Sequence, residues 1–224
     1  MRRLLAIILV CALIAGVGVG CKKAEVKPTE QVVNLGGIEP LTGGSATFGI
    51  SGNKGSVMAV EAFNAAGGAT IDGVKTTINF IGEDDTGSPE VGASAIQKLI
   101  NDSKVIGIIT NGTSKVALAV GPIAQAAGVP MISSVSTNLG VTLLGDYIFR
   151  ACFIDSFQGT VMANYAYNTL KVKTAAVLYD NGNDFNKGLA EVFKTVFEKD
   201  GGKVVSYEAS VSYTHLTLPT IYSV

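Results

Sequence analysis

From residue 32 to residue 210, short apolar runs alternate with longer segments whose apolar residues recur at helical spacing. The apolar runs predict strands, and the longer segments, several of them opened by Pro or closed by Gly, predict helices. We expect strands over 32–38, 76–81, 105–109, 131–132, 175–179 and 203–207, and helices over 52–66, 89–100, 114–127, 157–170 and 185–199. Strands that alternate with helices predict βαβ units and parallel sheets, so the expected fold class is α/β.

A short extended segment at 147–150 separates two series of strands and helices. It is typical of a crossover between two bodies rather than of a continuation of one sheet. We therefore expect a first lobe over residues 32–148 and a second lobe over residues 149–210, each a parallel sheet flanked by helices.

The first twenty residues follow a different pattern. Arg2 and Arg3 precede an almost wholly apolar run with small residues near its end, which predicts an export signal over 1–20. The alternative is a membrane anchor, because the run is close to the length that spans a bilayer. Cys21 follows directly, and 17–21 resembles a bacterial lipobox, although Gly18 stands where a leucine-like residue is usual. We expect Cys21 to be lipidated and the polar residues 21–31 to tether an exported domain to a membrane.

The strand and helix pattern stops after Ser210. Residues 211–224 contain no Asp, Glu, Lys or Arg and include His215, the one histidine of the chain. We interpret them as a non-native tail that resembles translated adaptor sequence, which predicts a chain truncated at its C-terminus. The alternative is a genuine edge strand interrupted by Pro219.

Composition excludes several classes of function. The 17 basic and 18 acidic residues give a formal net charge of −1, which provides no basic field for nucleic acid. If His215 is discounted, the chain has no histidine for a Ser-His-Asp, Cys-His or His-metal site. We therefore expect that the protein is not an enzyme. The cysteines, at positions 11, 21 and 152, form no disulfide framework, and we expect Cys152 to be buried.

Two further motifs carry weaker signals. The acidic residues 83–85 could bind a cation, but a solvated turn before the helix at Pro89 is the favoured interpretation. The glycines at 43, 44, 49 and 52 follow the first strand without the spacing of a dinucleotide site, and the long loop over 41–52 separates strand from helix. We expect neither a metal nor a cofactor.

Two neighbouring strands run into loops rich in hydroxyl groups, at 110–114 and at 133–138. The ends of parallel strands form a ligand crevice, and hydroxyls with free backbone N–H groups at a helix start suit an anion such as a carboxylate. The two loops predict a recognition site for a small polar molecule, without catalysis.

Together these segments resemble the branched-chain amino-acid family of ABC-transporter substrate-binding proteins, over about residues 32–209. The resemblance rests on the order and spacing of motifs at 39–43, 64–68, 84–85, 107–109, 113–114, 128–133, 136–138, 149–150, 180, 185 and 188–189. It implies the two-lobe type I periplasmic-binding fold, here incomplete at the C-terminus.

The resemblance also implies six ligand-binding positions, which are Phe48, Ser114, Ser136, Thr137, Asp155 and Phe185. In the family, the hydroxyls at Ser114 and Thr137 hold the carboxylate of the ligand. The carbonyl at Ser136 and the carboxylate at Asp155 hold its ammonium group. The two phenylalanines cover the ligand and stand where tyrosine is usual.

The function implied is a lipid-anchored extracytoplasmic receptor that captures an amino acid, of the branched-chain type, and delivers it to an ABC permease. Three departures from the family are Val135 in place of serine, a missing lobe-one disulfide, and an acidic ammonium ligand that would lie beyond residue 210. The alternatives are a sensory receptor of the same fold for amides or urea, and a nucleotide-binding α/β enzyme.

Overall fold

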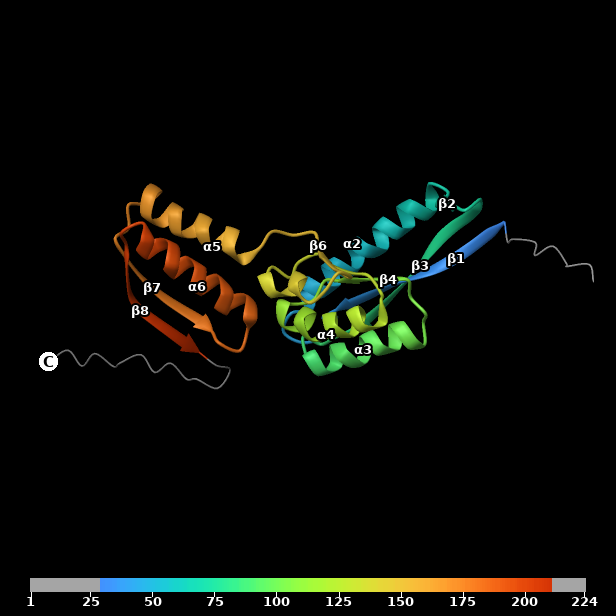
Figure 1. Ribbon diagram of the computed structural model, residues 1–224, viewed down its shortest axis with the longest axis horizontal. Coiled ribbons are helices and arrows are strands. Elements are labelled where there is room, and N and C mark those ends of the chain that lie inside the picture. Colours follow the sequence, from blue (N-terminus) through green and yellow to red (C-terminus); the bar gives the residue numbers. More distant parts are fainter. Residues whose placement is uncertain (1–28, 211–224) are drawn as a thin grey trace, which may run out of the picture.

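The computed structural model describes residues 29–210. These residues form a larger unit around a six-stranded sheet, called lobe one, and a smaller unit with a two-stranded sheet, called lobe two (Figure 1). Lobe one contains β1 Glu30–Glu39, α2 Ala46–Ala65, β2 Ala69–Ile71, β3 Val74–Asp84, α3 Pro89–Asn101, β4 Gly107–Thr110, α4 Ser114–Ala127, β5 Met131–Ser133, the 3₁₀ helix η2 Leu139–Leu143 and β6 Ile148–Arg150. Lobe two contains α5 Asp155–Asn164, the π-helical η3 Tyr165–Thr169, β7 Thr174–Asp180, α6 Asp184–Lys199 and β8 Lys203–Ser210.

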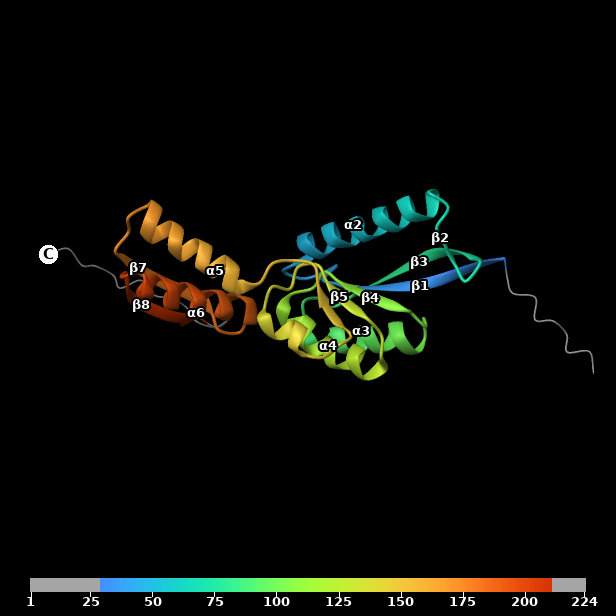
Figure 2. The same cartoon turned by 45° about the horizontal axis from the view of Figure 1, so that its top comes forward.

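The lobe-one sheet has the strand order β2-β3-β1-β4-β5-β6, and all neighbours except the antiparallel pair β2–β3 are parallel. Helix α2 covers one face of this sheet, and α3 and α4 cover the other (Figure 2). The α/β class and the parallel sheet are therefore confirmed. The carboxyl ends of the parallel strands meet at one edge, where ligands bind in open α/β sheets.

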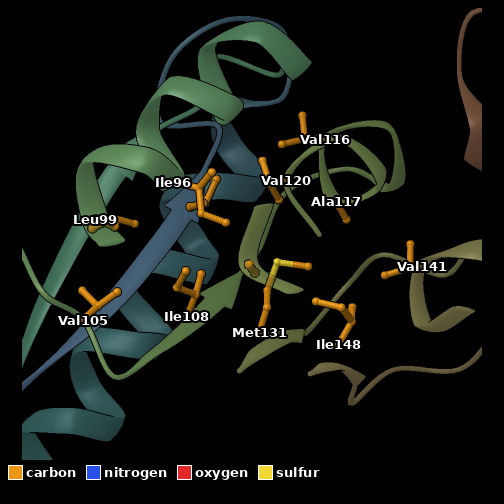
Figure 3. Close-up of a cluster of buried hydrophobic side chains, with 12 residues drawn as sticks. Ile96, Leu99, Val105, Ile108, Val116, Ala117, Val120, Met131, Val141 and Ile148 are labelled. Carbon is orange, nitrogen blue, oxygen red and sulfur yellow. The ribbon is translucent and has the colours of Figure 1, made fainter. Parts of the chain in front are cut away.

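The core of lobe one lies between the sheet and helices α3 and α4 (Figure 3). Its twelve buried side chains are Ile38, Ile96, Leu99, Val105, Ile108, Val116, Ala117, Val120, Ala124, Met131, Val141 and Ile148. On α3 the apolar positions 92, 95, 96 and 99 recur at helical spacing and are all buried. Because this stripe faces the sheet, packing rather than intrinsic propensity stabilises the helix.

The predicted bounds of the helix at 114–127 are those of α4. Thr113 Oγ1 accepts a hydrogen bond from the Val116 N–H at its start, and Gly128 ends it with φ 65°, a left-handed conformation that glycine adopts without cost.

The helix predicted at 52–66 begins earlier, at Ala46, so the expected long loop over 41–52 is wrong in part. Gly49 and Gly52, two of the glycines assigned to that loop, lie inside the helix. A Cβ atom on Gly49 would come within 2.1 Å of the Pro40 carbonyl oxygen. These glycines therefore allow close packing and do not mark a loop.

Three other boundaries differ from the expectation. The helix predicted at 157–170 ends at Asn164 and continues as the π-helical η3. Strand β2 was not predicted, although Asp72 and Gly73, with φ of 50° and 81°, make the tight turn that joins it to β3. Strand β6 pairs with β5 as far as Arg150, so the sheet of lobe one extends past the expected limit at residue 148.

The expected signal segment, Cys21, most of the tether and the tail with His215 lie outside the described residues. Within residues 29–210, no helix combines the length and the apolar character needed to cross a membrane.

Candidate functional site

A cavity of about 340 Å³ lies between the carboxyl edge of the lobe-one sheet and the start of α6 in lobe two. Its walls are Pro40, Ser45, Phe48, Asn111, Gly112, Thr113, Ser114, Val135, Asn183, Phe185 and Asn186. The cavity is large enough for a small molecule, and its lining combines aromatic and aliphatic side chains with a few polar groups, as is usual for ligand sites.

Phe48 of lobe one and Phe185 of lobe two both line this cavity. Phe48 lies in the first turn of α2 and is 73% exposed. Phe185 lies in the first turn of α6, where its backbone N–H donates to Asn183 Oδ1 at 3.1 Å and so caps the helix. The structure therefore places the two predicted aromatic positions on the walls of one cavity, one from each lobe.

The two hydroxyl-rich loops lie against each other. Ser114 is buried, lines the cavity, and its Oγ accepts a hydrogen bond from the Asn138 N–H at 3.2 Å. Ser136 Oγ donates to the Gly112 carbonyl at 2.9 Å. Because β4 and β5 are neighbouring parallel strands, the loops that follow them meet at one point of the sheet edge.

Ser136, Thr137 and Asp155 do not line the cavity but are buried beside it. The Asp155 N–H donates to the Thr137 carbonyl at 2.9 Å, which joins the start of α5 to the loop after β5. Within the described part of the chain, Thr137 Oγ1 and both carboxylate oxygens of Asp155 have no hydrogen bond of ordinary geometry. Buried polar atoms without partners are costly, so this group of atoms is suited to a polar ligand.

Burial raises the pKa of the Asp155 carboxyl group above its ordinary value, while the nearby Thr137 hydroxyl and the Arg150 guanidinium act in the opposite direction. The Ser136 carbonyl accepts a hydrogen bond from Arg150 Nη1 at 3.1 Å. A carbonyl oxygen has two lone pairs, so this bond leaves one of them for a further donor.

Two contacts join the lobes at this point. Asn138 Nδ2 donates to the Asp184 carbonyl at 3.1 Å. A Cβ atom on Gly188 would lie 3.5 Å from Asn138 Nδ2 of lobe one and 3.1 Å from Asp155 Oδ2, so the backbone of α6 comes close to both side chains. The start of α6 therefore covers the buried group of predicted ligand residues.

The acidic residues 83–85 do not form the solvated turn that we expected. Asp84 accepts hydrogen bonds from the Leu41 N–H at 2.8 Å and from Thr42 Oγ1 at 2.6 Å, which fixes the loop after β1. Asp85 is fully buried because α3 and the loop after β4 cover it; its Oδ1 accepts from the Gly87 N–H at 2.7 Å, and its Oδ2 has no partner among residues 29–210. No group of three metal-ligating side chains occurs in that range.

Glu39, at the end of β1, is a buried carboxyl group that the sequence did not single out. It accepts hydrogen bonds from Asn53 Nδ2 at 2.6 Å and Asn111 Nδ2 at 3.0 Å. Burial raises the pKa of both Glu39 and Asp85. A nearby carboxylate adds to this effect in each case, that of Asp85 for Glu39 and that of Asp84 for Asp85. The sequence feature that could have indicated Glu39 is its position at the end of an apolar strand, where the strand reaches the ligand-binding edge of the sheet.

Cys152, in the segment between the lobes, is a half-buried free thiol, and burial raises its pKa. We expected this side chain to be buried, and it is only partly so because the crossover segment lies at the surface of both lobes.

Residues 32–215 match the periplasmic binding protein family. The chain belongs to this family. A Leu/Ile/Val-binding protein homologue from Brucella melitensis is 38% identical over 180 residues, which cover 79% of this chain and 47% of that protein. An amino acid binding protein from Pseudomonas aeruginosa is 34% identical and covers 79% of this chain and 46% of its own length.

Solved structures give the same assignment. The branched-chain amino acid transporter substrate-binding protein LivJ from Streptococcus pneumoniae, in complex with isoleucine, superposes with a TM-score of 0.74 at 33% identity. That match covers 82% of this chain and 51% of the LivJ chain. The leucine-binding protein LivK from Thermotoga maritima gives 0.69 at 30% identity. The resemblance to substrate-binding proteins is thus confirmed, and this periplasmic binding protein spans about half the length of the relatives it matches.

Proposed function

We propose that this periplasmic binding protein is part of an extracytoplasmic receptor that captures an amino acid of the branched-chain type for an ABC importer. One observation carries the proposal: Thr137 Oγ1 and the Asp155 carboxylate are buried close together where the two lobes meet, and among residues 29–210 neither has a hydrogen bond of ordinary geometry. An amino acid supplies both the anion and the cation that such a site requires. The proposal agrees with the names of the relatives, which describe a Leu/Ile/Val-binding protein homologue and a complex with isoleucine.

The chemistry of the site follows from its charges. The hydroxyls of Ser114 and Thr137 would donate to the carboxylate of the ligand, and the Asp155 carboxylate with the Ser136 carbonyl would accept from its ammonium group. The cavity beside them, with Phe48 and Phe185 on opposite walls, would receive the apolar side chain. Neither step breaks or forms a covalent bond, so the protein would act by binding alone.

Binding would favour the closed arrangement of the lobes, because ligand contacts come from both sides of the cleft. The closed form would then be recognised by the ABC permease. We also propose that Cys21 carries the lipid anchor, with 1–20 as the signal that is removed and 21–31 as the tether, so that the receptor stays at the membrane surface.

The direct test uses the product of the locus, sequenced beyond the codon for Ser210 and expressed without the signal. Leucine, isoleucine and valine should raise its melting temperature, and the rise should grow with the logarithm of their concentration, because a ligand at 100 times its Kd stabilises a protein by about 2.7 kcal/mol. Glutamate, urea, a short amide, NAD and ATP complete the panel. Stabilisation by urea or the amide alone would favour the sensory receptor, and stabilisation by no amino acid would refute the proposal.

The anchor needs a separate test. Cells that express the wild-type protein and its Cys21→Ser variant are labelled with a radioactive fatty acid, and their membranes are separated. We expect label and membrane association only for the wild type. Equal labelling of both proteins would contradict lipidation at Cys21.

A further inference from the structure

We propose that Arg150 is a positioning residue that holds the ligand loop, residues 136–142, in the conformation that binds the amino acid and contacts lobe two. This inference rests on the proposed function. Arg150 does not line the cavity, so it would act through the loop and not through the ligand.

The guanidinium of Arg150 makes three hydrogen bonds to this loop. Nη1 donates to the carbonyls of Ser136 at 3.1 Å and Asn138 at 2.6 Å, and Nη2 donates to Thr142 Oγ1 at 2.8 Å. The planar guanidinium presents its N–H groups in a fixed fork. These contacts therefore determine the orientation of the loop as well as its distance from Arg150. Hydrogen bonds from a charged donor are also about twice as strong as neutral ones.

The part of the loop that Arg150 holds carries the groups on which recognition depends. Thr137, whose buried hydroxyl has no hydrogen bond of ordinary geometry within residues 29–210, lies in the sequence between the two residues whose carbonyls accept from Arg150. Asn138 contacts both lobes, because its N–H donates to Ser114 Oγ and its Nδ2 donates to the Asp184 carbonyl. A displacement of this loop would therefore disturb the carboxylate site and the contact between lobes together.

Arg150 itself is fixed to lobe one. It is the last residue of β6 and pairs with Ser133 of β5, and the next N–H, of Ala151, donates to the Ser133 carbonyl at 2.9 Å. The crossover to lobe two begins at the following residue. The guanidinium thus attaches the ligand loop to β6, the last strand of lobe one before the crossover to lobe two.

The charge of Arg150 adds a second effect. It lowers the pKa of the Asp155 carboxyl group, against the effect of burial, and so favours the ionised form that an ammonium group needs. The groups that act on this carboxyl are the Thr137 hydroxyl and Arg150, and the Cys152 thiol is close enough to be affected by it. Loss of the guanidinium should therefore move the acid limit of ligand binding to higher pH.

The test compares Arg150→Met, Arg150→Lys and Thr142→Val in the complete product of the locus. The control is Lys98→Met, which removes a surface ion pair with Glu83 at 2.8 Å in the same lobe. Hydrogen exchange of the ligand loop, residues 136–142, is measured without ligand, and the Kd for leucine is measured by calorimetry between pH 5 and 8.

We expect Arg150→Met to speed exchange in this segment, to weaken binding by about tenfold or more, and to move the acid limit upward. Lysine keeps the charge but not the fork, so Arg150→Lys should restore the pH profile and only part of the affinity. Thr142→Val, which loses a single contact, should weaken binding by about threefold at most. The control should match the wild type in all three measurements.

Wild-type affinity and exchange in the Arg150→Met variant would overturn the inference. If that variant does not fold, the lysine variant decides, because unchanged affinity and exchange in Arg150→Lys would overturn it equally. If the wild type binds no amino acid while Arg150→Met still exchanges faster, the proposed function fails and the loop-positioning role stands.

Discussion

The side chain of Asn111 fills the space in front of Gly52, so that a Cβ atom on that glycine would lie 2.6 Å from Asn111 Cβ. Helix α2 and the loop after β4 therefore meet where no methyl group fits. Asn111 cannot move freely, because its Nδ2 donates to Glu39 and Ser56 and its Oδ1 accepts from Ser134. The helix and this buried polar cluster depend on each other.

We predict that Gly52→Ala destabilises the protein by about 1–3 kcal/mol, the usual cost of overpacking. The matched change is Gly55→Ala in the same helix, where nothing lies within 4 Å of the added methyl group. Alanine has the higher helix propensity, so this second variant should gain about 0.5–1 kcal/mol. Urea denaturation measures both, and similar effects of the two substitutions would contradict the close contact at Gly52.

We predict that Asp155→Asn weakens binding of leucine by about tenfold or more, because a hydrogen bond to a charged partner contributes about 1.5–3 kcal/mol. For the wild type, affinity should fall as the pH is lowered, since protonation removes the charge that the ammonium group needs. Burial raises the pKa of this carboxyl group, so the fall begins at a higher pH than for an ordinary aspartate. Calorimetry across pH checks this, with the exposed Asp146→Asn as the control.

We predict that the Asp85 carboxyl group makes the unliganded protein less stable as the pH rises above about 4. Burial raises the pKa of Asp85 above its ordinary value of 3.8, so its contribution to stability is complete below that value and is lost as the pH rises through the raised pKa. Asp85→Asn keeps an oxygen for the Gly87 N–H and removes the titration.

The variant should therefore show a smaller loss of stability over this range, although not a complete absence of it, because the pKa of Glu39 is raised in the same direction. Urea denaturation at several pH values gives the free energies of unfolding. A pH dependence identical to that of the wild type would refute this role of Asp85.

We predict that Phe48→Ala lowers the affinity for leucine several-fold and changes the free energy of unfolding by no more than about 0.5 kcal/mol. The reason is that Phe48 is 73% exposed and faces the cavity, so its packing partner would be the ligand. Phe149→Ala, at a phenylalanine that is 50% exposed and outside the cavity lining, is the control. Equal affinities of the two variants would place the ligand elsewhere.

Much of the fold could be predicted because local rules and tertiary packing agree. Helix α4 has its capping threonine, its apolar stripe and its terminal glycine in the sequence, and its bounds were predicted without error. Helix α2 was placed too short because its glycines, read as loop residues, serve close contacts with Pro40 and Asn111 that only the folded chain brings near. The Asp-Gly pair before β3 is typical of a tight hairpin turn and so indicates a strand at β2.

The site was predictable in its residues more than in its arrangement. The loops after β4 and β5 were expected to meet, and they do. The sequence does not show the strand order, which places β1 between β3 and β4 and so buries Glu39 near Asp85 and Asn111. It also does not separate the residues that line the cavity from those buried beside it, because that division depends on where α6 of the second lobe lies.

The contact between Asn138 of lobe one and Asp184 of lobe two is a single neutral hydrogen bond. A bond of this kind contributes about 1 kcal/mol, which corresponds to roughly a fivefold bias in a two-state equilibrium. By itself it would leave the two lobes opening and closing, with a sizeable minority of molecules open at any moment. Under the proposed function, an amino acid that makes two charged contacts would outweigh this bias many times over. Binding would then change how often the lobes are closed, and the lobes could close without it.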